Sequence, residues 1–289
     1  MAKIRKAVVP VAGLGTRMLP GAKVVPKELL NVVDRPILSY IVEEGRAAGI
    51  EHFVFVTGRN KSAIEDYFDH QVELEEQLRA KKKDSLLAEL LKDLPEAGSM
   101  SFVRQMQPKG LGHAVWCARD IIGNEPFAVM LPDMIMDADV PALKQAVSAH
   151  EATNGSNIIV VEEMAQSQLH QYGVVALSKQ DGRCNPMTGM VEKPQPGTAP
   201  SNLIVSGRYI LNPEIFDLLS DQAAGAGGEI QLTDAMARLM ASQSFHALQY
   251  EGVTYDCGDK IGLLRANVAL ALKHPQLAAT AREAVTSLL

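Results

Sequence analysis

Three cations lie in one loop that is rich in glycine and proline. Gly13 and Gly15 follow an apolar run of strand length, and Arg17, Lys23 and Lys27 come soon after them. A glycine pair behind a buried strand lets backbone N–H groups approach a phosphate closely, and Arg and Lys can neutralise its charge. The loop therefore predicts a site for a highly charged phosphate compound.

Two common nucleotide motifs do not fit this loop. A dinucleotide-binding fingerprint would have a third glycine at Met18, and its helix would run through Pro20 and Pro26, which interrupt helices. The P-loop pattern is absent as well. An oxidoreductase would thus have to be supported by binding of NAD. No G-x-S-x-G element occurs and no cysteine stands beside an evident base, so no covalent nucleophile is predicted.

Two aspartates stand at the ends of predicted strands, far apart in the sequence. Asp133 follows the apolar run 126–132, and Asp256 closes the short run 253–255. Open α/β sheets bind ligands at the carboxyl ends of their strands, and Mg²⁺ takes one or two carboxylates together with phosphate oxygens and water. Taken alone, Asp133 could equally be a helix cap or a turn residue.

Apolar runs of strand length alternate with segments of helical periodicity along most of the chain. Strands are predicted over residues 4–11, 52–57, 101–105, 126–132, 156–163, 172–178, 203–211 and 245–250. Helices are predicted over residues 36–49, 111–122, 140–152, 213–220, 230–242, 260–273 and 275–288. This alternation predicts a Rossmann-like α/β fold of three layers, in which a mixed, mostly parallel sheet has helices on both faces.

Two regions depart from the alternation within what we expect to be a single domain, 1–289. Residues 61–93 form one long helical stretch with opposite charges at helical spacing, which indicates a helical insertion over about 61–98. Residues of about 164–210 combine short strands with turn signals and predict a small β cap. Gly225–Gly228 should be a connecting loop, and C-terminal helices should occupy about 260–289.

The composition is that of an ordinary globular chain with a mild acidic excess. Among 289 residues, 28 Lys and Arg stand against 34 Asp and Glu, a formal net charge of −6. Nucleic-acid binding needs clustered basic residues, so no such partner is expected. No apolar stretch reaches the ~18 residues of a membrane span. The basic and apolar segment 1–13 is interrupted by Pro10 and indicates a buried strand rather than a signal peptide.

The cysteines and histidines predict neither disulfides nor a zinc site. Cys117, Cys184 and Cys257 lie far apart and form no C-x-x-C pair. The seven histidines form no H-x-H or H-E-x-x-H pair. We therefore expect a cytoplasmic protein in a reducing environment.

The motifs resemble those of the sugar-nucleotide pyrophosphorylases nearly from end to end. The likeness comprises Gly-x-Gly-Thr-Arg-x-x-Pro at 13–20, Pro-Lys-Glu at 26–28, the run from Arg104 to Ala114, Leu131-Pro132-Asp133, Val191-Glu192-Lys193-Pro194 and Tyr255-Asp256-Cys257-Gly258. The charged insertion and the run 228–234 are more similar to the uridylyltransferase branch than to the thymidylyltransferase branch. Ala22 and Asn31 depart from the family pattern, which puts one loop contact in doubt. The implied fold is that of the nucleotide-diphospho-sugar transferases.

This resemblance implies transfer of a uridylyl group from UTP to glucose 1-phosphate, with pyrophosphate leaving and Mg²⁺ as cofactor. Asp133 and Asp256 would bind the metal, Arg17 and Lys27 the β- and γ-phosphates, and Lys193 the phosphate of the sugar. Such a reaction needs positioning and neutralisation of charge more than covalent chemistry. The absence of a nucleophile motif agrees with it.

The resemblance also implies residues that select the substrates. The nucleotide group comprises Ala12, Gly13, Gly15, Thr16, Glu28, Gln105 and Gly110. The sugar group comprises Gly173, Glu192, Lys193 and Gly207. The Gln105 amide both donates and accepts, so it can match the uracil edge. The roles of Lys23, His113 and Arg208 stay open, since Arg208 could be a packed surface cation and His113 a first-turn helix residue.

Two alternatives remain open. A sugar-1-phosphate thymidylyltransferase would share most of the motifs. A regulatory paralogue would bind nucleotide sugars without converting them, but it would be expected to lose a loop cation or a metal carboxylate, and this chain retains them. The resemblance further suggests a homodimer or homotetramer, with 260–288 and 61–93 as candidate contact surfaces.

Overall fold

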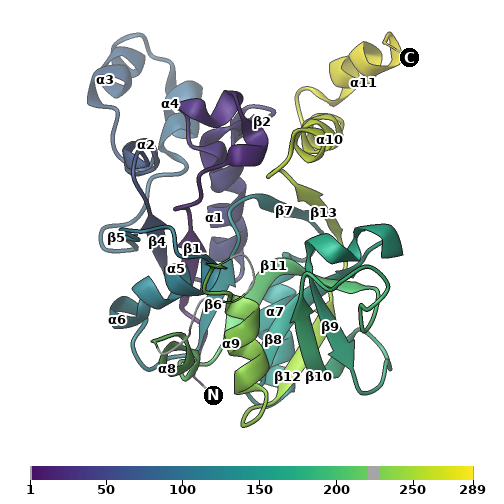
Figure 1. The fold of residues 1–289 in the computed structure, drawn as a ribbon. Coiled ribbons are helices and arrows are strands. Elements are labelled where there is room, and N and C mark those ends of the chain that lie inside the picture. The colour runs from purple at the N-terminus through teal and green to yellow at the C-terminus, as the bar shows by residue number, and fades with distance from the viewer. Residues whose placement is uncertain (1, 221–224, 226–227, 289) are drawn as a thin grey trace.

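A nine-stranded sheet forms the centre of the molecule. The computed structural model describes residues 2–220, 225 and 228–288, whose arrangement is shown in Figure 1. Across the sheet the strands are β5 (Met100–Arg104), β4 (His52–Thr57), β1 (Lys6–Pro10), β6 (Phe127–Met130), β11 (Leu203–Leu211), β8 (Asn157–Glu163), β12 (Phe245–Gln249), β10 (Cys184–Glu192) and β9 (Gly173–Leu177). All the main strands predicted from the sequence are present, close to their expected bounds. Part of the predicted connector 225–228 lies outside the described residues.

Most strands of this sheet run in one direction. β5, β4, β1 and β6 pair in parallel, as do β8 and β12, whereas β10 and β11 run opposite to their neighbours. The sheet is thus mixed and mostly parallel, as predicted. Because β1 and β6 are parallel neighbours, the loop after β1 and Asp133 after β6 lie at the same edge of the sheet.

Helices cover both faces of the sheet, because successive apolar residues of a strand point to opposite faces and each face must be covered. On β4, Val54 and Val56 belong to the apolar core on one face, and Phe53 and Phe55 to the core on the other. The first core is closed by α5 (Leu111–Cys117), α6 (Arg119–Ile122), α8 (Ile215–Ser220) and α9 (Leu232–Leu239). The second is closed by α1 (Ile37–Ala47) and α7 (Ala142–Ala152). The predicted three-layer α/β fold is confirmed, although the helix expected over 111–122 is divided at Ala118.

The helical stretch predicted over 61–93 is present but is not one helix. It consists of α2 (Ser62–Tyr67), α3 (Val72–Ala80) and α4 (Asp84–Leu91). The expected charge pairing is seen between Glu75 and Arg79, whose side chains approach to 2.9 Å. The chain turns at Lys82, which has a left-handed φ of 51°, so that α4 packs against α3. The charge pattern alone does not reveal this turn.

The strands of the predicted cap continue the main sheet. β10 pairs with β12, and β9 pairs with both β10 and β11. The predicted cap range, 164–210, ends inside β11, which lies between β6 and β8 at the centre of the sheet. The structure thus corrects this boundary. An apolar run has the same pattern whether it ends an insertion or returns to the main sheet, so the sequence could not separate the two cases.

Two small sheets complete the fold beside the main one. β7 (Met134–Asp137) pairs with β13 (Val253–Asp256), and β2 (Asn31–Val32) pairs with β3 (Arg35–Pro36). The sequence predicted the run at 253–255 but not β7, its partner. α10 (Lys260–Ala271) and α11 (Ala278–Thr286) follow, at the upper right of Figure 1. The helical arm, which consists of α2, α3 and α4, lies at the upper left.

The described part of the chain contains no helix long and apolar enough to cross a membrane. Its three cysteines, Cys117, Cys184 and Cys257, are all free thiols.

Candidate active site

The loop after β1 folds back over Lys27. Gly15 has a left-handed φ of 66°, and a Cβ at this position would lie 3.4 Å from the Cβ of Lys27. Two short 3-10 turns, Thr16–Met18 and Lys27–Leu29, carry the cations Arg17 and Lys27. Ala12 is half-buried, whereas Gly13 and Thr16 are exposed. The middle of this loop is therefore open to a ligand.

Asp133 and Asp256 lie side by side where β13 pairs with β7. This place, which Arg17 and Lys27 also reach, is called the corner here. Cys257 donates its backbone N–H to the Asp133 carbonyl at 2.7 Å. The pairing of β13 with β7 places Asp256 opposite Met134, the residue after Asp133. The two strand-end carboxylates singled out in the sequence thus come from adjacent backbone segments.

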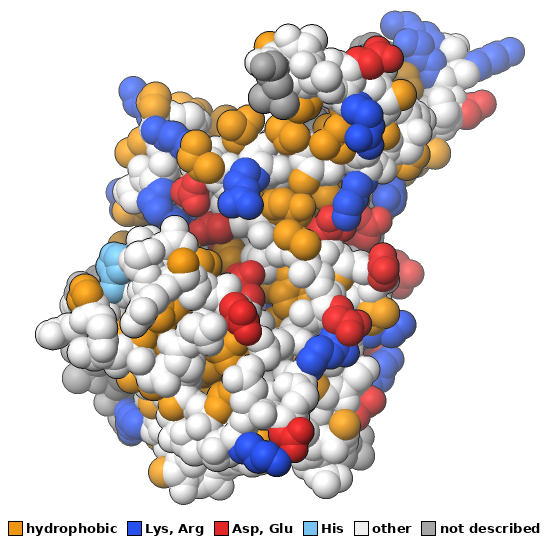
Figure 2. Space-filling view, turned by 90° about the vertical axis from the view of Figure 1, so that its right-hand side faces the viewer, with side chains coloured by type: hydrophobic (Ala, Val, Ile, Leu, Met, Phe, Trp, Pro, Cys, Tyr) orange, Lys and Arg blue, Asp and Glu red, His pale blue; other side chains and the backbone are white. Residues whose placement is uncertain are grey.

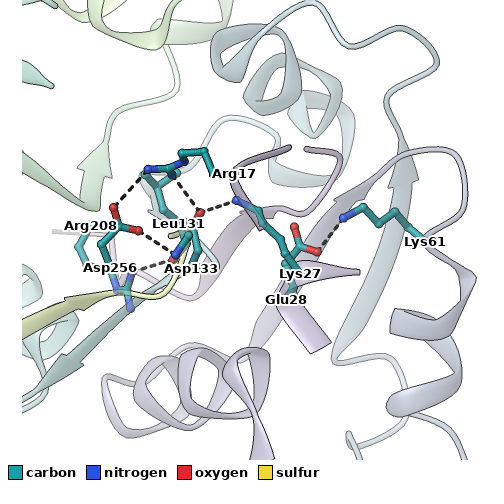
Figure 3. A network of polar contacts seen from close by, with 9 residues as sticks. Arg17, Lys27, Glu28, Lys61, Leu131, Asp133, Arg208 and Asp256 are labelled. Atoms are coloured by element: carbon teal, nitrogen blue, oxygen red, sulfur yellow. Dashed lines mark hydrogen bonds and ion pairs between the residues drawn. The ribbon is translucent and has the colours of Figure 1, made fainter. Parts of the chain in front are cut away.

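Arg17 and Lys27 contact these carboxylates, as Figure 3 shows. Lys27 Nζ is hydrogen-bonded to Asp133 Oδ2. Arg17 Nη2 lies 4.0 Å from the same oxygen, and Arg17 Nη1 lies 3.5 Å from Asp256 Oδ2. Lys23 is exposed and forms no ion pair with any residue that the structure describes. The corner therefore gathers two cations and two carboxylates, without the third loop cation.

Burial and mutual contact act in opposite directions on these charged groups. Burial alone would raise the pKa of Asp133, but Lys27 and then Arg17 outweigh it and hold this pKa below its usual range. Burial alone would lower the pKa of Lys27, and contact with Asp133 raises it instead. Burial, followed by repulsion from Asp133, raises the pKa of Asp256. The corner thus favours the charged form of Asp133 and disfavours that of Asp256.

Gly258 leaves the space between the two carboxylates open. A Cβ at this position would lie 2.7 Å from Asp133 Oδ2, 2.8 Å from Asp256 Oδ1 and 2.7 Å from Arg17 Nη2. Any other residue would therefore fill the point on which these groups converge. Gly258 was not among the glycines that the sequence singled out, although it belongs to the run Tyr255–Gly258.

The donor set at this point fits a hard divalent cation. Such ions accept carboxylate oxygens and complete their shell with phosphate oxygens and water, and nucleotide-transferring enzymes typically use one. No cluster of three or more His, Cys, Asp or Glu that could hold a metal occurs among the residues described. A cation here would thus depend on Asp133, Asp256 and its substrate.

Glu28 lies behind the corner rather than in it. Its side chain is completely buried, and its Oε2 accepts a hydrogen bond of 2.7 Å from Lys61 Nζ. Burial raises the pKa of Glu28, although Lys61 opposes the shift. Figure 3 shows this pair apart from the two aspartates. The pair joins the loop after β1 to the residue directly before α2. No motif in the sequence pointed to Lys61.

Gln105 and Gly110 form the second group, on the loop after β5. Gln105 is buried, and its Nε2 donates to the Gly110 carbonyl at 3.1 Å and to His113 Nδ1 at 2.9 Å. Burial and then Lys109 lower the pKa of His113, so the ring is neutral near pH 7 and can accept. Both amide hydrogens are thereby used, whereas Gln105 Oε1 accepts no hydrogen bond from the described residues. Gly110 has a φ of 103°, and a Cβ there would lie 2.7 Å from the Ile230 carbonyl.

The predicted sugar residues come together except for Gly207. Glu192 Oε2 accepts a 2.8 Å hydrogen bond from Thr233, which the sequence did not single out, and would lie 3.1 Å from a Cβ at Gly173. Lys193 is exposed, and its Nζ lies 3.9 Å from Glu192 Oε1. Gly207 instead faces Leu131, whose side chain would lie 3.0 Å from a Cβ at position 207. A side chain at position 207 would therefore press against Leu131, and a contact of Gly207 with the sugar stays a prediction.

Arg208 is not a surface cation. Its side chain is completely buried and forms an ion pair of 2.6 Å with Glu44. This corrects one of the two interpretations that the sequence had left open for Arg208.

Comparison with known proteins agrees with this geometry. Residues 6–272 match the family model of the nucleotidyl transferases. The chain is 50% identical over 277 residues to UTP–glucose-1-phosphate uridylyltransferase 2 of Staphylococcus saprophyticus, an alignment that covers 96% of this chain and 95% of the relative.

Solved structures give the same result. The chain is similar to a UTP-bound UGPase from Acinetobacter baumannii, with 43% identity, a TM-score of 0.91 and coverage of 99% of this chain and 100% of that one. It is also similar to a UDP-glucose pyrophosphorylase complexed with UDP-glucose, with 40% identity, a TM-score of 0.82 and coverage of 94% and 100%. The resemblance that the sequence motifs indicated is confirmed. The chain belongs to the nucleotidyl transferase family.

Proposed function

We propose that this chain is a UTP:glucose-1-phosphate uridylyltransferase, which converts UTP and glucose 1-phosphate to UDP-glucose and pyrophosphate. The observation that carries the proposal is the convergence of Asp133 and Asp256 with Arg17 and Lys27 beside an open glycine loop. This arrangement suits a reaction in which charged phosphates are held and their charge is offset. The similarity to uridylyltransferases over nearly the whole chain supports the choice of substrates.

The cations of the phosphate loop would act on the leaving group. Attack by a sugar-phosphate oxygen on the α-phosphorus releases pyrophosphate in line, and negative charge grows on the leaving oxygen. Arg17, a fork of donors, and Lys27, a point charge, would bind the β- and γ-phosphates and offset that charge. Because Arg17 is 59% exposed and contacts the aspartates only at 3.5 and 4.0 Å, it can turn towards a phosphate without losing a short bond.

Asp133 and Asp256 would hold Mg²⁺. The ion, when bound, neutralises charge on the phosphate oxygens of the nucleotide. The side chains keep space for it because residue 258 is glycine. Mg²⁺ is proposed over softer metals because the two donors, Asp133 and Asp256, are carboxylates.

The remaining site residues would select the two substrates. Gln105 Oε1, with its amide N–H groups already used, would accept the uracil N3–H. The backbone at Ala12, Gly13, Gly15 and Thr16 would lie along the nucleotide. Lys193 would bind the phosphate of glucose 1-phosphate, and Glu192 would accept hydrogen bonds from its hydroxyl groups. Gly173 leaves room beside Glu192. Glu28, being completely buried, would act through its neighbour Lys27 instead of touching the base.

We further propose that the enzyme works in the cytoplasm as a homodimer or homotetramer, with neither nucleic acid nor membrane as a partner. Figure 2 shows hydrophobic side chains gathered on the upper part of the face where α10 and α11 lie. Ile261, Leu264 and Leu277 are exposed there, and contact with another copy would cover them. The free thiols are compatible with a reducing compartment.

A substrate panel tests the proposed function. Purified protein would be incubated with glucose 1-phosphate, Mg²⁺ and either UTP or dTTP, and then with UTP and galactose 1-phosphate, while pyrophosphate release is followed. We expect the highest kcat/KM for UTP with glucose 1-phosphate, and no release in EDTA. Preference for dTTP would favour a thymidylyltransferase. Binding of UDP-glucose without any turnover would indicate a regulatory paralogue and contradict the proposal.

A further inference from the structure

Arg208 is among the largest side chains that the fold buries completely. It follows Gly207, which has a left-handed φ of 86°, on a part of β11 where the pairing register with β8 shifts. Gly207 accepts a backbone hydrogen bond of 2.8 Å from Leu131. The irregularity in β11 thus holds the strand against Leu131, two residues before Asp133.

The guanidinium of Arg208 brackets Asp133 from the side of its backbone. Nη1 donates to the Leu131 carbonyl at 3.0 Å, and Nη2 donates to the Met134 carbonyl at 2.8 Å. Figure 3 shows Arg208 beside Leu131 and Asp133. The carbonyl of Asp133 itself accepts from the Cys257 N–H. One rigid planar group therefore fixes the chain on both sides of Asp133, and a second contact ties Asp133 to the segment that carries Asp256.

Glu44 on α1 holds the other side of this guanidinium. Its carboxylate accepts from Arg208 Nε at 3.1 Å and from Nη2 at 2.6 Å. It also accepts from the Leu143 N–H at the start of α7, at 3.0 Å. Because α1 and α7 both belong to the core of one face, the position of Arg208 is set by the framework of the fold.

The ion pair with Glu44 does not by itself account for this arrangement. A buried ion pair can often be replaced by apolar side chains of similar size without loss of stability. Apolar side chains here would leave the carbonyls of Leu131 and Met134 without these donors. Groups that bind a metal have to be held within about 0.5 Å of their working geometry, and the bracketed residue is the one that the proposed function assigns to Mg²⁺.

We propose that Arg208 is a positioning residue that holds Asp133 for metal binding, with Glu44 as its charge partner. This inference rests on the proposed function, in which Asp133 is a ligand of Mg²⁺. Lysine could not replace Arg208, because a single ammonium group has no planar fork with which to bridge two carbonyls and a carboxylate.

The test measures how strongly Mg²⁺ promotes UTP binding. Calorimetric titration of UTP into the protein, without sugar phosphate, gives the dissociation constant in EDTA and in Mg²⁺, and the ratio of the two reports metal binding without turnover. Arg208→Lys should lower this ratio about tenfold, as loss of a residue that orients a metal ligand does, and leave the constant in EDTA near that of the wild type. Glu44→Gln keeps the arginine fork and an oxygen that can accept from it, and is the matched control. It leaves the buried guanidinium without its charge partner, so it should lower stability while the ratio stays close to wild type.

A double variant guards against misfolding. Arg208→Met with Glu44→Met removes both buried charges at similar volume. The carbonyls of Leu131 and Met134 lose their donors, so this variant should be less stable than the wild type, but where circular dichroism shows it folded it should still have the lowered ratio. A wild-type ratio in Arg208→Lys or in the folded double variant would overturn the inference. An equally lowered ratio in Glu44→Gln would do so too, since charge balance would then explain the effect. Failure of the wild-type protein to bind UTP would instead contradict the proposed function, and this result is recognised before any substitution.

Discussion

Arg17 and Arg208 both contact the segment around Asp133, but they differ in burial and in the length of their contacts. Arg17 is 59% exposed and approaches two carboxylates at 3.5 and 4.0 Å. Arg208 is 0% exposed and contacts Glu44 at 2.6 Å and two backbone carbonyls at 2.8 and 3.0 Å. The exposed arginine is held loosely enough to follow a substrate, whereas the buried one is part of the frame.

The same division separates the other charged groups. Lys27 lies at the corner and forms an ion pair with Asp133. Glu28, the next residue, is completely buried and forms an ion pair with Lys61. Neighbouring residues of one loop therefore serve different purposes. The side chains proposed to contact the substrate lie at the corner. The buried ion pairs behind them, such as Glu28 with Lys61, hold the backbone that carries these side chains.

Among the cations, the largest effect on catalysis is expected for Arg17→Ala. Loss of a group that stabilises charge on the leaving phosphate should lower kcat/KM for UTP by about 10²- to 10³-fold. The melting temperature should hardly change, because the side chain is exposed and its contacts are long. Steady-state kinetics and thermal unfolding of the same preparation would check both. A stable variant with the wild-type rate would show that Arg17 does not act on the substrate.

Lys61→Met should affect stability where Arg17→Ala does not. It leaves Glu28 buried without its partner, so the free energy of unfolding at pH 7 should fall by about 3–5 kcal/mol. Burial raises the pKa of Glu28. A carboxyl with a raised pKa in the folded state loses stability as the pH rises from its unfolded pKa of about 4.3 through the folded pKa.

The penalty of Lys61→Met should therefore shrink as the pH falls, because below about pH 4 Glu28 is protonated in both the folded and the unfolded state. Urea unfolding at several pH values measures this trend. Lys61→Arg, which retains the charge, is the matched control. A loss of stability that is the same at every pH would mean that packing of the lysine stem, and not the ion pair, is responsible.

Gln105→Leu extends the comparison to the base. The uracil edge would lose its proposed acceptor, and an unpaired group in a binding site costs about 1–3 kcal/mol. The preference for UTP over CTP, measured as the ratio of kcat/KM values, should fall about tenfold. His113→Phe, which removes the acceptor that fixes the Gln105 amide, should lower the ratio less. An unchanged ratio in both variants would place base selection elsewhere.

Lys23→Ala should give the smallest effect. Lys23 is exposed, belongs to the same loop as Arg17 and contacts neither aspartate. We expect less than about a threefold change in kcat/KM, within the range of an ordinary surface substitution. A loss as large as that of Arg17→Ala would show that Lys23 also reaches the phosphates. Contact with the aspartates would then not distinguish the loop cations that act on the substrate from those that do not.

The fold could be predicted largely because its strands are buried on both faces. Such strands appear in the sequence as short apolar runs, and eight of the nine strands of the main sheet were found in this way. The ninth, β10, was not assigned a range, because few of its residues are buried. β7 was missed because its four residues follow Asp133 directly and its partner, β13, is far away in the sequence. The end of the cap at 210 was misplaced because β11 rejoins the centre of the sheet, which only the pairing of strands reveals.

The site divides in the same way. Arg17, Lys27, Asp133 and Asp256 could be selected from the sequence because loop cations and strand-end carboxylates have a recognisable context. The buried charges behind them could not. Glu44 lies on α1 and Lys61 directly before α2, neither belongs to a motif, and only the folded chain pairs them with Arg208 and Glu28. Gly258 was overlooked because the side chains of Asp133, Asp256 and Arg17 converge on it only in the folded chain.

The most direct test of the central claim compares UDP-glucose formation by the wild-type protein and by Asp133→Asn. Both would be assayed with saturating UTP, glucose 1-phosphate and Mg²⁺, after circular dichroism has shown that both are folded. We predict that the wild type forms UDP-glucose and that the variant is slower by about a thousandfold. Equal rates would contradict the assignment of catalysis to the corner formed by Asp133, Asp256, Arg17 and Lys27.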